Sequence, residues 1–377
     1  MKIAIVCYPT FGGSGVVATE LGLALSKKGH QIHFITYNLP VRLEALKDPN
    51  IFFHEVNVPD YPLFKYQPYE LALSSRLVDV IKKFKIDLLH VHYAIPHAYA
   101  AYMAKKMLED QGIYIPIVTT LHGTDITLVG SHPFYKSAVT FSINNSDCVT
   151  AVSQSLKKDT LALFDIKNEI EVIPNFIDIS KYEGVPTPCE RSLLAKTDEK
   201  ILTHISNFRP LKRIMDVIAI YEKVKEKIPC KLLMVGEGPE CSKAMEYCEK
   251  HQLDNVVFLG KSNQIDEILC YSDLFLLTSE QESFGLVALE AMVHKVPVIS
   301  SDAGGISEVN LDGYSGYISK IGDIEAMSNK AITLLLDPEK HQKFKQQAFE
   351  QARKFDLYKV IHQYEKVYER ALAKINS

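Results

Sequence analysis

The chain alternates short apolar runs with helix-forming segments, and this order is the feature that most restricts its fold. The first example is an apolar run at 3–7, a glycine-containing turn, a helical segment at 14–28 that ends at Gly29, and a second apolar run at 31–36. A strand, helix, strand order of this kind is typical of a parallel α/β sheet. The start of the chain therefore predicts such a sheet.

The later apolar runs form two series, separated by the polar stretch 183–199. The first series predicts strands at 87–92, 117–121, 148–152 and 170–173, with helical segments such as 98–108 between them. The second predicts strands at 201–206, 231–235, 256–259, 274–277 and 296–300. We therefore predict an α/β protein of two doubly wound, parallel-sheet domains. Their bounds are 1–170 together with 356–377, and 171–355.

The C-terminal segment 357–375 carries an apolar stripe at helical spacing, which includes Val360, Tyr364, Val367 and Ala371. The stripe predicts a helix that packs on the first domain. Contact with a membrane surface through the lysines is the alternative, but tyrosine and glutamate interrupt any strongly basic face.

Composition limits the partners and the compartment. The 377 residues are 47% hydrophobic and 23% charged, as in ordinary globular proteins, and the net charge of -4 argues against nucleic acid as a partner. Seven cysteines occur without a Cys-x-x-Cys pair, which favours reduced thiols. The first apolar run is too short for a secretory signal, and no segment approaches ~20 apolar residues. We expect a cytoplasmic protein without stable membrane insertion; a homo-oligomer stays open.

A strand, loop, helix unit surrounds the stretch 282–292. Gly285 lets the backbone approach a ligand closely, and the start of the following helix favours a phosphate. Glu282 and Glu290 would reach different parts of one extended ligand, which suits a sugar nucleotide. In the alternative reading Glu282 and Ser283 cap the helix and Glu290 lies on its solvated face.

Basic and glycine-rich loops follow other strands of the second series. Arg209, Lys212 and Arg213 place three cations within five residues, which could neutralise a diphosphate or form a solvated basic loop. Glycine loops at 236–239 and 304–308 fall on the same predicted rim.

In the first domain, polar residues gather where the predicted strands end, among them His92, Tyr93, Thr120 and His122. The segment 13–18 fits the Gly-x-Gly-x-x-Ala fingerprint of dinucleotide sites. However, its glycines come late after the strand, and the second strand ends without the acidic residue that holds a nicotinamide ribose. We therefore interpret the 12–15 loop as a phosphate or acceptor loop.

His90 and His92 alternate along one predicted strand and would share a face. They could be metal ligands, but no cluster of cysteines or carboxylates accompanies them. We predict no metal site.

Together, the segments 282–290, 304–308 and 236–239 and Asn175 resemble the retaining glycosyltransferases of family 4 over nearly the whole chain. The resemblance implies the GT-B fold, in which two Rossmann-like domains face each other across a cleft. The N-terminal domain would bind the acceptor and the C-terminal domain the nucleotide sugar.

Further motifs at 7–15, 64–66, 92–97, 119–125 and 206–209 narrow the resemblance within this family. They are similar to the members that transfer N-acetylglucosamine from UDP-N-acetylglucosamine to the hydroxyl of L-malate, with retention, in the first step of bacillithiol biosynthesis. The sugar nucleotide is a co-substrate, and no cofactor is implied. Alternatives are a lipid or sugar-phosphate acceptor, or a catalytically silent nucleotide-sugar-binding protein.

The resemblance also implies roles for individual residues. Those implied in catalysis are His122, Arg209, Lys212 and Glu282. Those implied in donor binding are Gly13, Asn207, Arg209, Lys212, Gly236, Lys261, Glu282, Ser283, Phe284, Gly285, Leu286 and Glu290. The acceptor candidates are Gly12, Ser14, Lys65, Tyr93, Thr120 and Asn175, with Arg42 as a further one.

One departure concerns the basic loop. Many family members carry Gly-Arg where this chain has Ser206 and Asn207, so the arginine is displaced to Arg209. We expect Arg209 and Lys212 to share the diphosphate, with Arg213 as an alternative for either.

Overall fold

The computed structural model describes residues 1–10, 12–41, 43, 48–182, 191, 195–196 and 198–376. It divides into two compact units, Met1–Phe176 with Leu357–Ser377, and Ile177–Asp356. The chain first passes from unit 1 to unit 2 between residues 176 and 177, whereas the sequence predicted this boundary between 170 and 171. The difference arises because the strand Ile170–Val172 pairs within the first sheet. Phe11, Arg42 and most of the polar stretch 183–199 lie outside the described residues.

Unit 1 is built on a sheet of seven parallel strands in the order β3-β2-β1-β4-β5-β6-β7. The order reverses between β1 and β4, which makes this the topological switch point of the sheet. The strands are β1 Lys2–Val6, β2 Gln31–Thr36, β3 Ile51–Glu55, β4 Leu88–His92, β5 Ile117–Leu121, β6 Cys148–Ala151 and β7 Ile170–Val172. The helices are α1 Gly13–Lys27, α2 Tyr69–Phe84, α3 Tyr99–Glu109, α4 Pro133–Asn144, α5 Gln154–Leu163 and α13 Leu357–Asn376, with π-helical turns η1 Ala94–Ala98 and η2 Thr124–Leu128.

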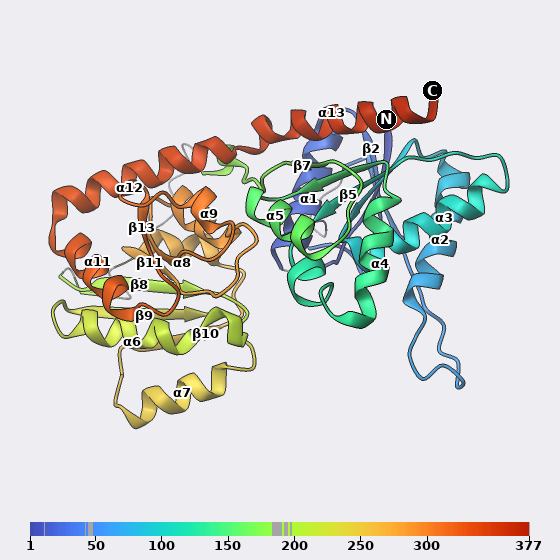
Figure 1. The fold of residues 1–377 in the computed structure, drawn as a ribbon. Helices are drawn as coiled ribbons and strands as arrows, with labels where there is room; N and C mark the ends of the chain where they lie inside the picture. The colour runs from blue at the N-terminus through green and yellow to red at the C-terminus, as the bar shows by residue number, and fades with distance from the viewer. Residues whose placement is uncertain are drawn as a thin grey trace. The chain divides into compact units, whose positions relative to one another are not determined.

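The C-terminal helix α13 belongs to unit 1, where it contacts α1, β4, β5 and β6 (Figure 1). Its stripe is fully buried at Tyr364, Val367, Tyr368 and Ala371. The prediction that this stripe packs on the first domain is confirmed, and burial of such large side chains is a main source of its stability.

Unit 2 repeats the architecture with six parallel strands in the order β10-β9-β8-β11-β12-β13. Its switch point lies between β8 and β11. The strands are β8 Lys200–Ile205, β9 Cys230–Val235, β10 Val256–Gly260, β11 Leu274–Leu277, β12 Val298–Ser301 and β13 Gly316–Ser319. The helices are α6 Ile214–Lys225, α7 Cys241–Lys250, α8 Ile265–Tyr271, α9 Leu286–Val293, α10 Ile306–Val309, α11 Ile324–Leu336 and α12 Pro338–Ala352, with 3-10 turns η3 Ile179–Lys181, η5 Pro210–Lys212 and η6 Arg353–Phe355.

Both sheets place their loops of interest at the carboxyl ends of the strands, where parallel α/β sheets bind ligands. The inner strands β1, β4, β5, β11 and β12 are almost completely buried, as their apolar runs predicted. The sequence did not predict the edge strands β3 and β13, which mix buried residues with partly buried or exposed ones.

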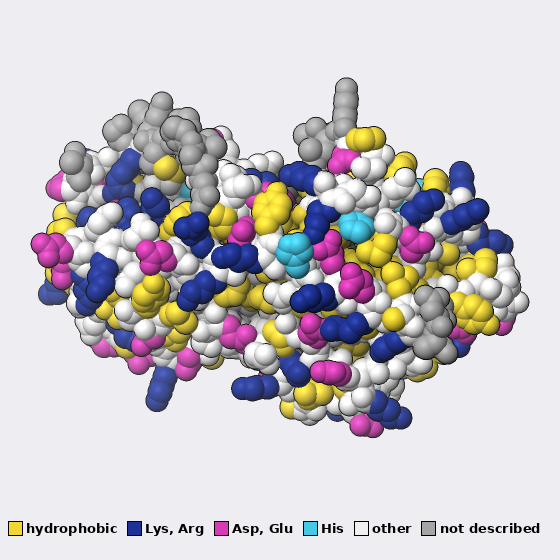
Figure 2. All heavy atoms as spheres, turned by 90° about the horizontal axis from the view of Figure 1, so that it is seen from above, with side chains coloured by type: hydrophobic (Ala, Val, Ile, Leu, Met, Phe, Trp, Pro, Cys, Tyr) yellow, Lys and Arg dark blue, Asp and Glu magenta, His cyan; other side chains and the backbone are white. Residues whose placement is uncertain are grey.

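Surface charge is mixed on the face seen in Figure 2, where lysine and arginine alternate with aspartate and glutamate. Within the described part of the chain, no helix combines the length and apolar character needed to cross a bilayer.

Candidate functional site

Two loops at the carboxyl edge of the unit 2 sheet pack backbone against backbone. Gly236 follows β9 at φ 122°, and a Cβ there would lie 1.8 Å from the carbonyl oxygen of Ser206. At Gly238 a Cβ would lie 2.0 Å from the carbonyl oxygen of Asn207. Only glycine fits at either position, so the loops after β8 and β9 form one close-packed floor.

The cation Lys212 is fixed beside this floor. Its ammonium forms an ion pair with Glu282 Oε1, which also accepts a hydrogen bond from Ser279 Oγ at 2.8 Å. Thr278 Oγ1 donates to the Lys212 carbonyl oxygen at 2.9 Å. Both charged side chains are mostly buried, so the ammonium is pre-positioned and keeps N–H groups beyond the one that Glu282 accepts.

The other cations of the predicted site differ in their partners. Arg213 donates to Asp216 Oδ2 at 2.6 Å and to Glu280 Oε1 at 2.7 Å, and these carboxylates raise its pKa. Arg209 is exposed and has no ion-pair partner among the described residues. The structure therefore leaves Arg209, rather than Arg213, as the second cation open to an anion.

Two predicted donor-site residues lie at the exposed margin of unit 2. Asn207 is exposed in the loop after β8. Lys261 is 79% exposed just after β10, with its ammonium 3.5 Å from Glu237 Oε2. Lys261 thus holds its position less firmly than Lys212 does.

The helix α9 begins beside the Lys212–Glu282 pair. Gly285 caps it at φ 96°, and a Cβ there would lie 2.4 Å from Cδ1 of Ile306. The first N–H groups of α9 have no partner within the helix, so they and the helix dipole favour an anion. Glu282 also joins the next loop, because its carbonyl oxygen accepts from the Gly305 N–H at 2.7 Å.

The remaining residues of this stretch have graded exposure. Phe284 is buried and its ring packs edge-on against Phe355, with centroids 5.4 Å apart. Ser283 and Leu286 are half-buried around the helix start. Glu290 is half-buried in the second turn of α9. The predicted donor residues 282–286 and 290 therefore lie on one loop and one helix.

At the switch point of unit 1, the start of α1 meets the loop after β4. Gly12 caps α1 and Gly13 begins it, both exposed. The Ser14 hydroxyl and the Tyr93 hydroxyl form a hydrogen bond at 2.8 Å. Gly15 is required here, because a Cβ would lie 2.5 Å from the Thr10 carbonyl oxygen. Three acceptor candidates, Gly12, Ser14 and Tyr93, are thus brought together.

His122 is buried at the end of β5 and is held by a second histidine. His92 Nδ1 and His122 Nε2 are 2.8 Å apart, and the Tyr93 ring packs against His122 with centroids separated by 5.2 Å. Burial lowers the pKa of His122 to about 3 and that of His97 to about 4, and it holds the pKa of His92 well below its ordinary value. These imidazoles are neutral at pH 7, so one nitrogen of the His92–His122 pair donates and the other accepts.

Thr120 is buried, and its side chain contacts residues of the neighbouring strands. Its hydroxyl bonds to His90 Nε2 at 2.8 Å and to Thr150 Oγ1 at 2.7 Å, and His90 Nδ1 bonds to the Tyr368 hydroxyl of α13 at 2.8 Å. His90 and His92 are therefore used in hydrogen bonds. Among the described residues, no three histidine, cysteine, aspartate or glutamate side chains are arranged to hold a metal ion.

Two further acceptor candidates are Lys65 and Asn175. Lys65 is in an exposed segment, with its ammonium 5.5 Å from the centroid of the Tyr66 ring. Asn175 is buried after β7, and its Oδ1 has no hydrogen-bond partner in the described part of the chain.

Comparisons with known proteins agree with this geometry. The family model described as Glycosyltransferase Family 4 matches residues 11–181, and the model described as Glycosyl transferases group 1 matches residues 189–351. Over 371 residues the chain is 47% identical to N-acetyl-alpha-D-glucosaminyl L-malate synthase of Bacillus anthracis, covering 98% of this chain and 96% of that protein. The chain belongs to glycosyltransferase family 4.

Solved structures agree with this family 4 assignment at the level of the fold. Sucrose-phosphate synthase from Thermosynechococcus elongatus matches with a TM-score of 0.81 at 19% identity, covering 99% of this chain and 100% of that one. Anabaena Alr3699/HepE, solved with UDP-glucose, matches with a TM-score of 0.81 at 20% identity over 98% and 99% of the two chains. The predicted GT-B fold class and the predicted family are confirmed.

One residue of this family 4 glycosyltransferase received no role from the sequence. Asp125 is buried beside the loop that carries His122 and accepts three backbone hydrogen bonds. Its place two residues after Gly123 was the available signal, because aspartate often bonds to the backbone N–H groups of a turn that contains glycine.

Proposed function

We propose that this chain transfers N-acetylglucosamine from UDP-N-acetylglucosamine to the hydroxyl of L-malate, with retention at the anomeric carbon. This is the first step of bacillithiol biosynthesis. The observation that carries the proposal is the 47% identity, over 98% of the chain, to a relative named as N-acetyl-alpha-D-glucosaminyl L-malate synthase. In the proposal, unit 2 binds the donor and unit 1 the acceptor.

The diphosphate of the donor would lie against Arg209, Lys212 and the start of α9. Lys212 is already held by Glu282, so little ordering is needed when an anion arrives. The close-packed loops at Gly236 and Asn207 would support the nucleotide, with Lys261 at its margin. These cations and N–H groups stabilise the leaving diphosphate, and no divalent metal is required.

Other roles follow the family resemblance. Glu290 would bind the uridine ribose, while Glu282 and the backbone at 283–286 would meet the sugar and the diphosphate. His122 would lie beside the sugar 6-hydroxyl. Its low pKa supports this role, because a neutral imidazole can accept from or donate to a hydroxyl.

The reaction breaks the bond between the anomeric carbon and the β-phosphate oxygen and forms a bond from that carbon to the malate hydroxyl oxygen. The hydroxyl proton passes to the departing phosphate oxygen, on the sugar face from which UDP leaves. Arg209, Lys212 and the α9 N–H groups stabilise the negative charge that develops there.

The two carboxylates of L-malate need cations or N–H donors. The N–H groups at the start of α1, from Gly12 and Gly13 onward, are suited to one carboxylate. Ser14 and Tyr93 add hydroxyl donors, and Lys65 and Asn175 are the further candidates. Thr120 would act indirectly, because its hydroxyl already bonds to His90 and Thr150.

A cytoplasmic location is part of the proposal. It rests on the six described cysteines, which are all free thiols, as expected in a reducing compartment.

The test is UDP release from UDP-N-acetylglucosamine in the presence of a chelator, with and without L-malate. Succinate, which has the two carboxylates but no hydroxyl, is the matched control acceptor. Proton NMR of the product gives the anomeric configuration. Malate-dependent release with an α-glycoside product is expected.

The other outcomes reassign the function. UDP release that does not depend on malate would favour a different acceptor, a lipid or a sugar phosphate. Tight UDP binding without any release would make the chain a silent nucleotide-sugar-binding protein.

A further inference from the structure

We propose that Asp125 is a positioning residue of the acceptor side, which holds Tyr93 and His122 in register by binding the backbone of both of their loops. The proposal rests on the function above for the identity of the acceptor. Asp125 itself need not touch a substrate.

The contacts of the Asp125 carboxylate join two strand ends. Oδ2 accepts from the Ala94 N–H of the loop after β4 at 2.8 Å. Oδ1 accepts from the Gly123 N–H at 2.9 Å and from the His122 N–H at 3.2 Å, both after β5. The side chain is 2% exposed, so these N–H groups have no water to replace it.

The backbone that Asp125 holds is in uncommon conformations. Tyr93 has φ 85° and ψ 134°, which is costly for a residue with a side chain, and Gly123 has φ 114°. Such conformations persist only where neighbouring bonds fix them. The Tyr93 N–H donates to the Thr120 carbonyl oxygen at 2.9 Å, and Asp125 adds bonds to the residue directly after Tyr93 and to both residues of the 122–123 peptide. Asp125 is therefore the side chain that ties these two strained segments together.

The constraint extends to a third loop. The Tyr93 hydroxyl bonds to Ser14 Oγ at 2.8 Å, and the Tyr93 ring packs against His122. A shift of the 93–94 peptide would therefore move the hydroxyl pair proposed for the acceptor and would uncouple it from the histidine proposed for the sugar.

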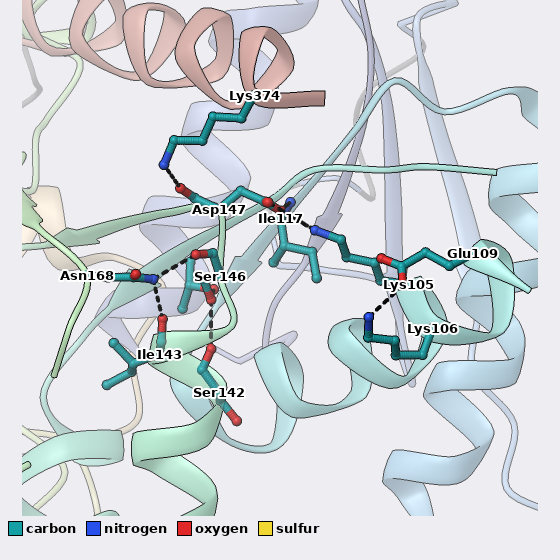
Figure 3. A network of polar contacts seen from close by, with 11 residues as sticks. Lys105, Lys106, Glu109, Ile117, Ser142, Ile143, Ser146, Asp147, Asn168 and Lys374 are labelled. Atoms are coloured by element: carbon teal, nitrogen blue, oxygen red, sulfur yellow. Dashed lines mark hydrogen bonds and ion pairs between the residues drawn. The ribbon is translucent and has the colours of Figure 1, made fainter. Parts of the chain in front are cut away.

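Asp147 provides a matched comparison. It lies near the opposite end of β5, where Oδ2 accepts from the Ile117 N–H at 2.7 Å and pairs with Lys105 at 2.8 Å (Figure 3). Lys374 of α13 also donates to its carbonyl oxygen, at 2.6 Å. Asp147 is thus a second carboxylate that binds the backbone of the same sheet, less buried than Asp125 and at the edge away from the predicted site.

The experiment compares Asp125→Asn with Asp147→Asn. In Asp125→Asn the new amide has one acceptor oxygen, and the orientation that keeps two bonds, from Gly123 and His122, turns its NH2 group toward the Ala94 N–H, from which it cannot accept. A displacement of about 1 Å at a reacting group costs roughly 100-fold. We therefore expect kcat/KM for L-malate to fall about 100-fold while UDP affinity stays within twofold. Asp147→Asn should lower the melting temperature and leave kcat/KM of the folded protein within twofold.

A second measurement does not depend on the acceptor. Amide exchange, followed by NMR, should show Ala94 and Gly123 protected in the wild type, with at least tenfold faster exchange at Ala94 in Asp125→Asn. If wild-type protein fails to use malate, the proposed function is lost, but these exchange rates still test Asp125. The proposal is overturned if Ala94 exchanges as fast in the wild type as in the variant, or if Asp125→Asn and Asp147→Asn lose equal activity.

Discussion

The two carboxyl edges hold their polar groups in different ways. In unit 1 the edge is built mainly from neutral side chains that bind one another, as in the His92–His122 and Ser14–Tyr93 pairs, while the buried Asp125 carboxylate binds backbone N–H groups. In unit 2 it is built from charges and bare backbone, with the Lys212–Glu282 pair beside loops that only glycine allows. The same sheet architecture therefore presents a hydrogen-bonding surface in unit 1 and an electrostatic one in unit 2.

The difference suits the two halves of a transfer reaction. A hydroxyl acceptor needs orientation, which mutually bonded neutral groups supply without adding charge. A departing diphosphate needs charge stabilisation, which a fixed ammonium and free N–H groups supply. Changes in unit 2 should therefore act mainly through charge, and changes in unit 1 through geometry and protonation.

The largest expected effect is that of Lys212→Ala. Loss of one fixed donor to the developing charge should lower kcat by about 10²- to 10³-fold. Lys212→Arg should recover part of the rate, because the charge is kept. The measurement is steady-state UDP release. Lys223→Ala, which removes an exposed cation paired with Glu325 at 2.6 Å, is the control and should be neutral. A loss of less than tenfold in kcat for Lys212→Ala would contradict the view that unit 2 acts mainly through charge.

The next effect is that of Gly236→Ala, which pushes a methyl group into the Ser206 carbonyl oxygen. Gly313→Ala is matched to it, because Gly313 also has positive φ, 73°, but has nothing within 4 Å of an added Cβ. Both variants bear the cost of the backbone conformation, so the clash should add about 1–3 kcal/mol of destabilisation at Gly236 alone. Urea unfolding and UDP titration measure it. Equal losses in the two variants would mean that the loops are not close-packed.

Low pH should destabilise unit 1 more than unit 2. Burial lowers the pKa of His90 and His122 to about 3 and of His97 to about 4, and it holds the pKa of His92 well below its ordinary value. A depressed folded pKa means that the stability is complete above the unfolded pKa of about 6.5 and is lost as the pH falls below it. For each proton taken up on unfolding, the free energy of unfolding falls by about 1.4 kcal/mol per unit that the pH is lowered in this range.

Asp125 acts in the opposite direction, because burial raises its pKa to about 6 and it favours the fold as the pH falls. Six buried histidines of unit 1 have a lowered pKa, because His33 and His54, at about 4, join the four named above, and they outnumber this one carboxyl. Among the described residues of unit 2, the buried histidines with a lowered pKa are His204, at about 4, and His341. Hydrogen exchange between pH 7.5 and 5 should show unit 1 losing protection first. Earlier loss in unit 2 would contradict the contrast.

The smallest effect is expected for Tyr368→Phe, which removes the hydroxyl that bonds His90 Nδ1. The ring stays buried, so the cost should be near that of one hydrogen bond, about 1 kcal/mol. Tyr358→Phe on the same helix is the control, because Tyr358 is 43% exposed. Urea unfolding of both variants checks the prediction, and equal values would show that the histidine network does not stabilise unit 1.

The sequence predicted the inner strands within one or two residues, because strands buried on both faces are continuous apolar runs. Two edge strands, β7 and β10, were also predicted, whereas the other two, Ile51–Glu55 and Gly316–Ser319, mix polar or small residues with apolar ones. Their pattern did not distinguish them from loops. These segments are strands because they pair with a neighbouring strand, β2 for β3 and β12 for β13, and such pairing cannot be read from the local sequence.

The candidate site residues could be placed on a rim from the sequence, but their contacts with one another could not. Glycine loops and cations after apolar runs indicated where the edge lies. The partner of Lys212 is 70 residues away, and the carboxylates that hold Arg213 include Glu280, 67 residues away. Thr120 has the right place on its strand, but its hydroxyl faces inward. Which side chains meet depends on strand order and register, and these emerge only in the folded chain.

The position of α13 has a consequence for synthesis on the ribosome. Unit 1 is interrupted by all of Ile177–Asp356, so its last helix is translated after unit 2 is complete. At ~5–20 residues per second, the roughly 200 residues after Phe176 take about 10–40 s. During that time the face that receives Tyr364 and Tyr368 has no cover. The nascent first unit therefore exposes this apolar face until α13 is made, and a chain cut short before Leu357 would display it permanently.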